Sequence, residues 1–361
     1  MSPRTNDQYL LRNRPPSEKL VDQGFQLLST SLASVVALVL LAILIVVFWG
    51  SLESMGRYGL SFLVTSNWNP VDDEYGAGTA IYGTLLTSLL ALLVAVPLGV
   101  GTAIFITENI LPRKVRDAIG VMVELLAAIP SVVLGLWALR VMEPFIRPAL
   151  SFLYSKECVP VNFAWDGLIQ LGGWSVQIPG FDRMIPNLGC WDLNLFGQAV
   201  NLHWLPILST IPQGPGLIPA VLILIVMILP IITAISRDSL NQVPAKLRQA
   251  AYGVGATRWS AILNIILPAA ISGITGGVML ALGRAMGETM AVTMIIGNSN
   301  NFSFSLLAPG NTIAAMLASQ FGEADGIQVS SLMYAAFILI LLTLVVNILA
   351  QRLVKQLSLK Y

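Results

Sequence analysis

Two residues of opposite charge stand close together in an apolar stretch of this chain. Residues 283–297 read GRAMGETMAVTMIIG, with Arg284 and Glu288 four positions apart among Gly, Ala, Met, Val and Ile. Residues four apart share one face of a helix, so these two side chains can pair. At the centre of a membrane each charge costs about 2.5–3.5 kcal/mol on insertion scales. A buried ion pair is often no more stable than apolar residues of the same volume, so stability is a weak reason for this pair.

The chemistry that suits the pair is passage of an oxyanion. The planar guanidinium of Arg284 offers several N–H donors to phosphate-like oxygens. The carboxylate of Glu288 repels a fully ionised oxyanion but accepts a hydrogen bond from one that keeps a proton, as phosphate does near neutral pH. We therefore predict a substrate pathway or gate at Arg284 and Glu288, with Glu124 and Thr289 as further candidates. An internal pair that only holds two helices in register is the alternative.

Composition indicates the kind of protein that must position these residues. Only 11% of the 361 residues are charged and the mean hydropathy is +0.76, whereas soluble domains carry about 25% charged residues. Six apolar runs are long enough to cross a bilayer: 27–49, 80–107, 118–142, 215–236, 269–297 and 331–352. We expect an all-α polytopic membrane protein with six transmembrane helices. A net charge of +1 argues against nucleic acid as a partner.

The basic residues predict the orientation of the chain. Most of the 20 lysines and arginines lie in the two tails and in the connections 108–117 and 237–261. Cytoplasmic loops carry this excess, so both termini are predicted to be cytoplasmic. The expected parts are a cytoplasmic tail 1–26, a permease domain 27–352 and a cytoplasmic tail 353–361.

The segment 143–214 is predicted to be an insertion on the outer face. It is rich in Gly, Pro and Trp and contains both cysteines, Cys158 and Cys190. An oxidising compartment makes a disulfide plausible, while two separate thiols stay open as the alternative. Two cysteines and the single histidine leave no metal cluster and no Cys–His dyad. We expect no catalytic residue, no bound metal and no cofactor in this chain.

Glycines around the charged pair predict close helix packing. Gly276, Gly283 and Gly287 form one stripe, and small residues at such spacing let membrane helices approach closely. The charged residues lie about 100° round the helix from the stripe. We expect the glycine face to pack on a neighbouring helix while Arg284 and Glu288 face a pathway.

A loop between the fourth and fifth runs, 237–268, predicts contact with another protein. Residues 246–268 read KLRQAAYGVGATRWSAILNIILP, which indicates a helix, a tight glycine turn and a second helix. Pro268 is expected to interrupt the second helix before the next span.

This loop resembles the "EAA" loop of ABC importer permeases. The residues that carry the resemblance are Gln249, Ala250, Ala251, Gly255, Ala256, Leu267 and Pro268. The resemblance implies the type I importer permease fold and a coupling helix that docks in a groove of a cytoplasmic ATPase. Gln249 stands where the family has Glu, which removes one charge and any salt bridge that it makes.

The segment GRAMGETMAV resembles the GRALGETMAV segment of the PstC-type permeases, membrane subunits of bacterial phosphate importers. Residues 81–108 and 124–139 carry the same resemblance. It implies translocation roles for Arg284 and Glu288 and a place in the bacterial inner membrane. It also implies three partners: a PstA-type sister permease, a PstB-type ATPase dimer and a PstS-type periplasmic phosphate-binding protein. No G-x-x-x-x-G-K-[ST] occurs in the chain, so ATP and Mg²⁺ are expected in the ATPase.

Three rival functions stay open at this point. The first is a permease of the same type for another oxyanion, such as molybdate or sulfate. The second is an ion-driven secondary transporter that works without an ATPase, although no inverted repeat is evident. The third is a structural or signalling scaffold.

The sequence also predicts a short outer helix within 311–326, capped by Asn311.

Overall fold

The computed structural model describes residues 16–108, 112–154, 168–171, 174–177, 192–195, 198–201 and 214–358. Most of these residues are helical, so the all-α prediction is confirmed. The first half contains α2 (Pro16–Tyr58), η1 (Gly59–Leu63), β1 (Trp68–Asn69), β2 (Glu74–Tyr75), α3 (Gly78–Thr107), α4 (Arg113–Ala128), α5 (Ser131–Trp137), the π-helical η2 (Ala138–Met142) and α6 (Glu143–Tyr154). The second half contains α7 (Leu217–Asn241), α8 (Ala245–Gly253), α9 (Arg258–Ala261), the π-helical η6 (Ile262–Ile266), α10 (Leu267–Gly287), α11 (Met290–Ile295), α12 (Ile313–Gln320) and α13 (Gly326–Ser358).

Within the residues that the structure describes, five continuous helical stretches are long and apolar enough to cross a membrane. They are Asp22–Leu63, Gly78–Thr107, Leu217–Asn241, Arg258–Gly287 and Gly326–Arg352. They correspond to five of the six expected spans.

The remaining expected span, 118–142, is not one straight helix. The helices on either side of Ile129 and Pro130 are bent by 98°. Proline lacks an N–H and disfavours helical backbone in the residue before it, and Ile129 is extended, with φ −70° and ψ 126°. The described part of the chain therefore has six spans only if this bent pair counts as one.

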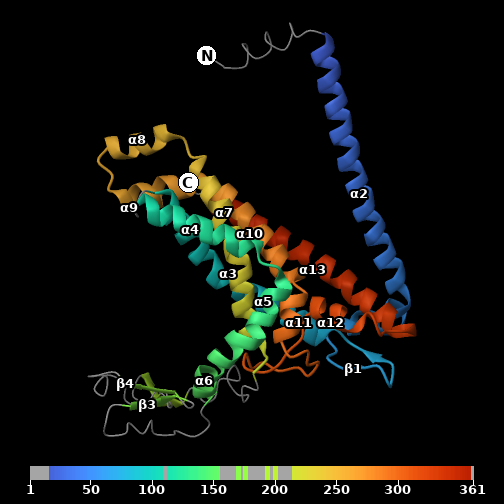
Figure 1. Ribbon diagram of the computed structural model, residues 1–361. Coiled ribbons are helices and arrows are strands. Elements are labelled where there is room, and N and C mark those ends of the chain that lie inside the picture. The colour runs from blue at the N-terminus through green and yellow to red at the C-terminus, as the bar shows by residue number, and fades with distance from the viewer. Residues whose placement is uncertain are drawn as a thin grey trace.

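Helices α3, α7 and α10 form the centre of the bundle (Figure 1). Small residues bring them close together. A side chain at Gly99 of α3 would meet Ile232 of α7, and one at Gly277 of α10 would meet Ile235 of α7. The buried face of α7 thus contacts both of the other helices, which fixes α10 relative to α3.

Helix α2 lies at the edge of the bundle, and its C-terminal part packs against the N-terminal part of α13 (Figure 1). Small polar contacts join the two helices: the hydroxyls of Ser54 and Ser331 lie 2.9 Å apart, and Ser330 donates to the carbonyl of Gly50 at 2.8 Å. The hydrophobic residues on the rest of α2 are exposed, with Leu27 at 74% and Trp49 at 72%. Lipid or another subunit must cover this surface in a membrane.

The expected short helix within 311–326 is present as α12, but its cap differs from the prediction. The hydroxyl of Thr312 accepts a hydrogen bond from the N–H of Ala315 at 3.2 Å. Asn311 is fully buried, and its amide group donates to the side-chain oxygen of Asn300 at 2.8 Å. The asparagine therefore ties the preceding loop together, and the threonine caps the helix.

Within the expected insertion 143–214, α6 continues the bent span and two antiparallel hairpins follow. The hairpins pair β3 (Leu168–Leu171) with β4 (Trp174–Gln177) and β5 (Asp192–Leu195) with β6 (Gln198–Asn201). Cys158 and Cys190 lie outside the described residues. The disulfide therefore stays a prediction.

Two glycines of α3 provide a test of this packing. A Cβ at Gly83 would collide with the backbone carbonyl of Asn311, whereas a Cβ at Gly101 would meet no atom within 4 Å. We expect Gly83→Ala to lower the free energy of unfolding by about 1–3 kcal/mol through overpacking. Gly101→Ala should leave it unchanged or slightly raised, because alanine favours helix. Thermal unfolding of the purified protein in detergent measures both, and equal stabilities would contradict the α3–loop contact.

Candidate functional site

The helix that carries Arg284 ends before Glu288. Helix α10 stops at Gly287, Glu288 is extended with φ −69° and ψ 121°, and α11 begins at Met290. The expectation of one helix through 269–297, with both charges on one helical face, is therefore wrong. Glycine has low helix propensity, and the carboxylate of Glu288 accepts a hydrogen bond from the N–H of Ala291 at 3.5 Å. This contact gives the chain a way to restart the helix after the break.

The ion pair itself is confirmed. Nε of Arg284 lies 3.4 Å from Oε2 of Glu288, and the side chains are 49% and 6% exposed. Oε1 of the same carboxylate accepts from the N–H of Ala291, so one oxygen of Glu288 faces the guanidinium and the other faces a backbone N–H. Arg284 lies in the last turn of α10, where a cation also interacts favourably with the helix dipole.

The pair uses only one edge of the guanidinium. Among the residues that the structure describes, Nε of Arg284 contacts Glu288, and neither terminal nitrogen has a protein partner. The two terminal amino groups of an arginine form a fork that matches two oxygens of one anion. The arrangement therefore holds a cation in place from one side and leaves hydrogen-bond donors for a ligand on the other.

A second helix break lies next to the first. Helix α5 begins after the bend at Pro130 and packs against α11, which begins after the break at Glu288. A side chain at Gly135 of α5 would lie 3.0 Å from Cα of Ala291 and 2.9 Å from the sulfur of Met294. In membrane proteins, interrupted helices are tolerated where they line a cavity or are buried in protein, and transporters often build substrate sites from them.

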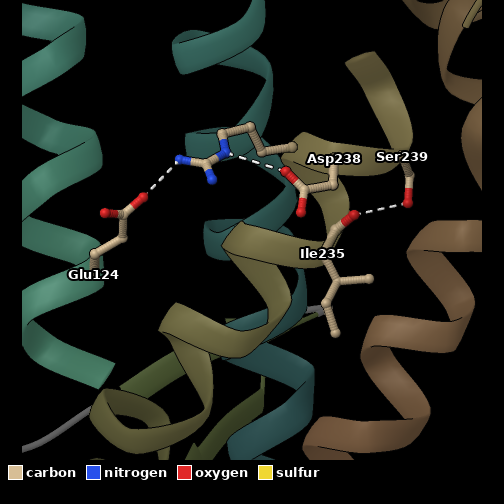
Figure 2. Close-up of polar contacts among 5 residues, drawn as sticks. Glu124, Ile235, Asp238 and Ser239 are labelled. Atoms are coloured by element: carbon tan, nitrogen blue, oxygen red, sulfur yellow. Dashed lines mark hydrogen bonds and ion pairs between the residues drawn. The ribbon is translucent and has the colours of Figure 1, made fainter. Parts of the chain in front are cut away.

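Glu124 lies in a different place from Arg284. It belongs to α4, its side chain is 62% exposed, and Oε1 lies 3.1 Å from Nη1 of Arg237 on α7. Nε of the same arginine lies 3.4 Å from Asp238 (Figure 2). This Arg237 bridge between α4 and α7 was not predicted. The sequence did offer two signals: Glu124 lies within one apolar run, and Arg237 directly follows another apolar run.

Thr289 precedes α11, is half-buried and makes no side-chain cap.

The predicted glycine stripe does not pack on another helix of the described chain. No atom lies within 4 Å of a Cβ built at Gly276, Gly283 or Gly287. The second glycine pair with G-x-x-x-G spacing, Gly273 and Gly277, makes the close contacts predicted by this spacing, with Ser239 and Ile235 of α7. The side of α10 that carries the stripe is open.

The predicted loop motif folds as expected up to its last residue. Helix α8 is followed by Gly255 in the left-handed region with φ +83°, and the hydroxyl of Thr257 caps α9 by accepting from the N–H of Ser260 at 3.4 Å. Gln249 and Ala250 are exposed, Ala251 is buried and Ala256 is half-buried. Large apolar residues on the loop are exposed: Leu247, Tyr252, Val254 and Trp259. Such a patch is typical of a surface that contacts another protein.

Pro268 does not interrupt the second helix, contrary to expectation. Helical structure runs continuously from Arg258 to Gly287. The π-helical segment η6 stands immediately before Leu267 and half-buried Pro268. The wider turn of a π-helix changes the hydrogen-bond partners locally, so the missing N–H of proline is accommodated.

A group of charged residues at the base of the loop was missed by sequence reasoning. Glu108 ends α3 and is 7% exposed. Arg248 of α8 forms an ion pair with its carboxylate, and Arg258 of α9 donates to its backbone carbonyl. The one available signal was an acidic residue at the end of an apolar run, facing a basic loop.

Comparison with known proteins places this geometry in context. The family described as "Binding-protein-dependent transport system inner membrane component" matches residues 95–359. The chain is 40% identical to the phosphate transport system permease protein PstC of Mesorhizobium japonicum, over 90% of this chain and 87% of that protein. It is 37% identical to PstC of Pasteurella multocida and 38% identical to PstC of Haemophilus influenzae, in each case over 94% of both chains.

A solved structure shares the fold. It is a bacterial alginate ABC transporter in complex with an alginate pentasaccharide-bound periplasmic protein, with a TM-score of 0.54 at 16% identity. The match covers 94% of this chain and 97% of that chain. The importer-permease fold expected from the sequence is therefore confirmed.

The ion pair predicts an asymmetry in stability. Replacing Arg284 with methionine leaves the buried carboxylate of Glu288 without its cation, and an unsatisfied buried group costs about 1–3 kcal/mol. We expect Arg284→Met to lower the free energy of unfolding more than Glu288→Gln, and the double variant to recover part of the loss. Thermal unfolding in detergent measures this cycle. A double variant as unstable as the sum of the two single variants would show that the residues do not interact.

Proposed function

Because this chain belongs to the family of binding-protein-dependent transport system inner membrane components, we propose that it forms part of the route by which inorganic phosphate crosses the bacterial inner membrane. Membership makes the chain a multi-pass inner-membrane permease, and thus a transport subunit rather than an enzyme. It also places the chain in a transport system that includes a binding protein.

The observation that carries the phosphate assignment is the open edge of Arg284. Its terminal nitrogens have no partner among the described residues, while Glu288 holds the opposite edge. A phosphate ion can take two hydrogen bonds from this fork. Monohydrogen phosphate keeps one proton that it can donate to a carboxylate, and sulfate at neutral pH has none. The chemistry of the pair and the names of the relatives favour the same substrate.

The proposed pathway runs past the two helix breaks. Arg284 and Glu288 serve as a passage or gate, and the nearby Thr289 can contribute a hydroxyl. Glu124 is a weaker candidate, because its carboxylate already contacts Arg237 and is 62% exposed. A permease for molybdate or sulfate is the remaining alternative of the same type.

The proposed energy source is a partner ATPase. We expect a PstB-type ATPase dimer, holding ATP and Mg²⁺, to dock on the loop through Gln249, Ala250 and the exposed apolar residues nearby. This chain itself then needs no cofactor. A PstA-type sister permease and a PstS-type periplasmic binding protein complete the assembly, with both termini of this chain in the cytoplasm. ATP binding draws the two loops together and opens the outer side, and the anion then passes Arg284 by alternating access.

Phosphate uptake by the full complex tests the role of Arg284. Arg284→Lys keeps the charge but loses the fork, so we expect uptake to fall at least about tenfold. This corresponds to a loss of about 1.4 kcal/mol of transition-state stabilisation. Arg113→Lys is the matched control, because Arg113 is 87% exposed and its one ion pair among the described residues is with Asp117, one turn away. Uptake of radiolabelled phosphate into proteoliposomes with internal ATP measures both variants.

Competition in the same assay separates the rival substrates. Excess unlabelled phosphate should abolish uptake, and equal molybdate or sulfate should not. Undiminished uptake by Arg284→Lys would show that transport does not need the two terminal N–H groups of the guanidinium. Uptake by this chain without an ATPase would favour the secondary transporter.

The turn glycine provides a test of docking. Gly255 has φ +83°, and a left-handed residue with a Cβ costs about 1–2 kcal/mol. Gly255→Ala should therefore distort the loop and weaken binding of the ATPase several-fold. Gly253→Ala is the control, because Gly253 ends α8 without a positive φ and no atom lies within 4 Å of an added Cβ. Pull-down of the ATPase by the solubilised permease measures both, and equal recovery would argue against docking at this turn.

A further inference from the structure

A single buried acidic residue fastens both helices of the loop to the transmembrane bundle. Glu108 follows the last turn of α3, where its N–H donates to the carbonyl of Ile104 at 2.9 Å. Arg248 of α8 donates from Nη1 to the carboxylate of Glu108, and Arg258 of α9 donates from Nη2 to its backbone carbonyl. The two arginines stand on opposite sides of the Gly255 turn. We call Glu108, Arg248 and Arg258 the Glu108 clamp.

The clamp also includes the end of α7. Nη2 of Arg248 donates to the carbonyl of Leu240 at 2.7 Å. This carbonyl lies in the last turn of α7 and also accepts from the N–H of Val243 at 3.3 Å, and a cation is favoured at this end of a helix. One guanidinium therefore joins α8 to the cytoplasmic ends of both α3 and α7, and it is only 23% exposed.

Helix α8 depends on the clamp more than the rest of the loop does. The segment η6 buries Ile262 and Ile266 in a hydrophobic cluster with Ala103 and Ile104 of α3. Within α8, by contrast, only Ala251 is buried. Apolar packing thus fixes the second helix of the loop on α3. Helix α8 packs on η6 and α9, and Arg248 supplies its side-chain hydrogen bonds to Glu108 and to the end of α7.

We infer that Glu108 is a positioning residue that transmits movement of the docked loop to α3 and α7. The inference rests on the proposed function, since the loop is moved only if an ATPase docks on it. Helix α7 packs closely on both α3 and α10, and α10 carries Arg284. A loop held at Glu108 moves α3 and α7 with it, whereas a loop without this contact can tilt α8 and leave the helices in place.

The coupling between ATP hydrolysis and import tests the inference. Glu108→Gln keeps the size of the side chain and removes its charge, so α8 should loosen while the ATPase still binds and hydrolyses ATP. In proteoliposomes containing the full complex, we expect phosphate import per complex to fall about tenfold with hydrolysis largely retained. The ATP used per phosphate imported should therefore rise about tenfold.

Two further variants make the measurement specific. Asp117→Asn removes an exposed acidic charge from α4 and should leave the ratio as in the unmodified complex, because Asp117 is 64% exposed and its one ion pair within the described ranges is with Arg113. Arg248→Lys keeps the cation but cannot reach Glu108 and the Leu240 carbonyl together, so the ratio should rise about threefold. This variant also provides the readout if Glu108→Gln fails to assemble.

The possible outcomes separate coupling from simple stability. If import and hydrolysis fall together in proportion to the amount of assembled complex, Glu108 has only a structural role and the inference is overturned. A ratio unchanged in both Glu108→Gln and Arg248→Lys overturns it as well. If the unmodified complex does not import phosphate with ATP, the proposed function fails, and the inference about Glu108 fails with it. An unmodified complex that imports normally beside an uncoupled Glu108→Gln supports both.

Discussion

A carboxylate removed from water needs a hydrogen-bonding cation beside it, and two such carboxylates organise this molecule. Glu288 lies at the break between α10 and α11 and is held by Arg284, and Glu108 lies at the end of α3 and is held by Arg248. Each carboxylate is about 7% exposed. Removing the arginine of either pair leaves a buried carboxylate without its cation in a low-dielectric environment, which strongly favours the paired geometry. The positions of the helix ends are therefore tied to the positions of the charges.

The two arginines differ in how much of the guanidinium the protein uses. Arg248 is 23% exposed, and both of its terminal nitrogens donate within the chain, to the Glu108 carboxylate and to the Leu240 carbonyl. Arg284 contacts Glu288 through Nε alone and is 49% exposed. The first arrangement is suited to rigidity, because two helices share one planar group. The second is suited to transient binding, because the fork is oriented but not filled. The same residue type thus serves structure at one end of α7 and the proposed transport site on α10.

Sequence reasoning identified the spans, the loop and the Arg284–Glu288 pair, because hydropathy, glycine spacing and isolated charges are local signals. It missed the places where a helix departs from regular geometry. The expected span 118–142 is bent at Pro130, and Pro268 was expected to interrupt a helix that in fact continues through a π-helical turn. The break at Glu288 follows Gly287, yet glycines are frequent in membrane helices and give no reliable stop signal. The Glu108 clamp joins residues 140 and 150 positions apart, a separation that no local pattern reveals.

The chain leaves three surfaces incomplete, and their chemistry differs in a way that fits the proposed assembly. The stripe of Gly276, Gly283 and Gly287 is open on the helix that bears half-exposed Arg284. An uncovered glycine stripe lets a second helix approach closely. A sister permease packed there would cover the stripe and enclose the exposed side of the Arg284 guanidinium. The loop exposes Leu247 and Trp259 beside polar Gln249, a mixture suited to a water-soluble partner. Helix α2 exposes an almost unbroken apolar surface, which suits lipid. In the proposed assembly, the fork of Arg284 would face substrate in a space from which the neighbouring subunit excludes water, whereas the isolated chain leaves this side chain 49% exposed.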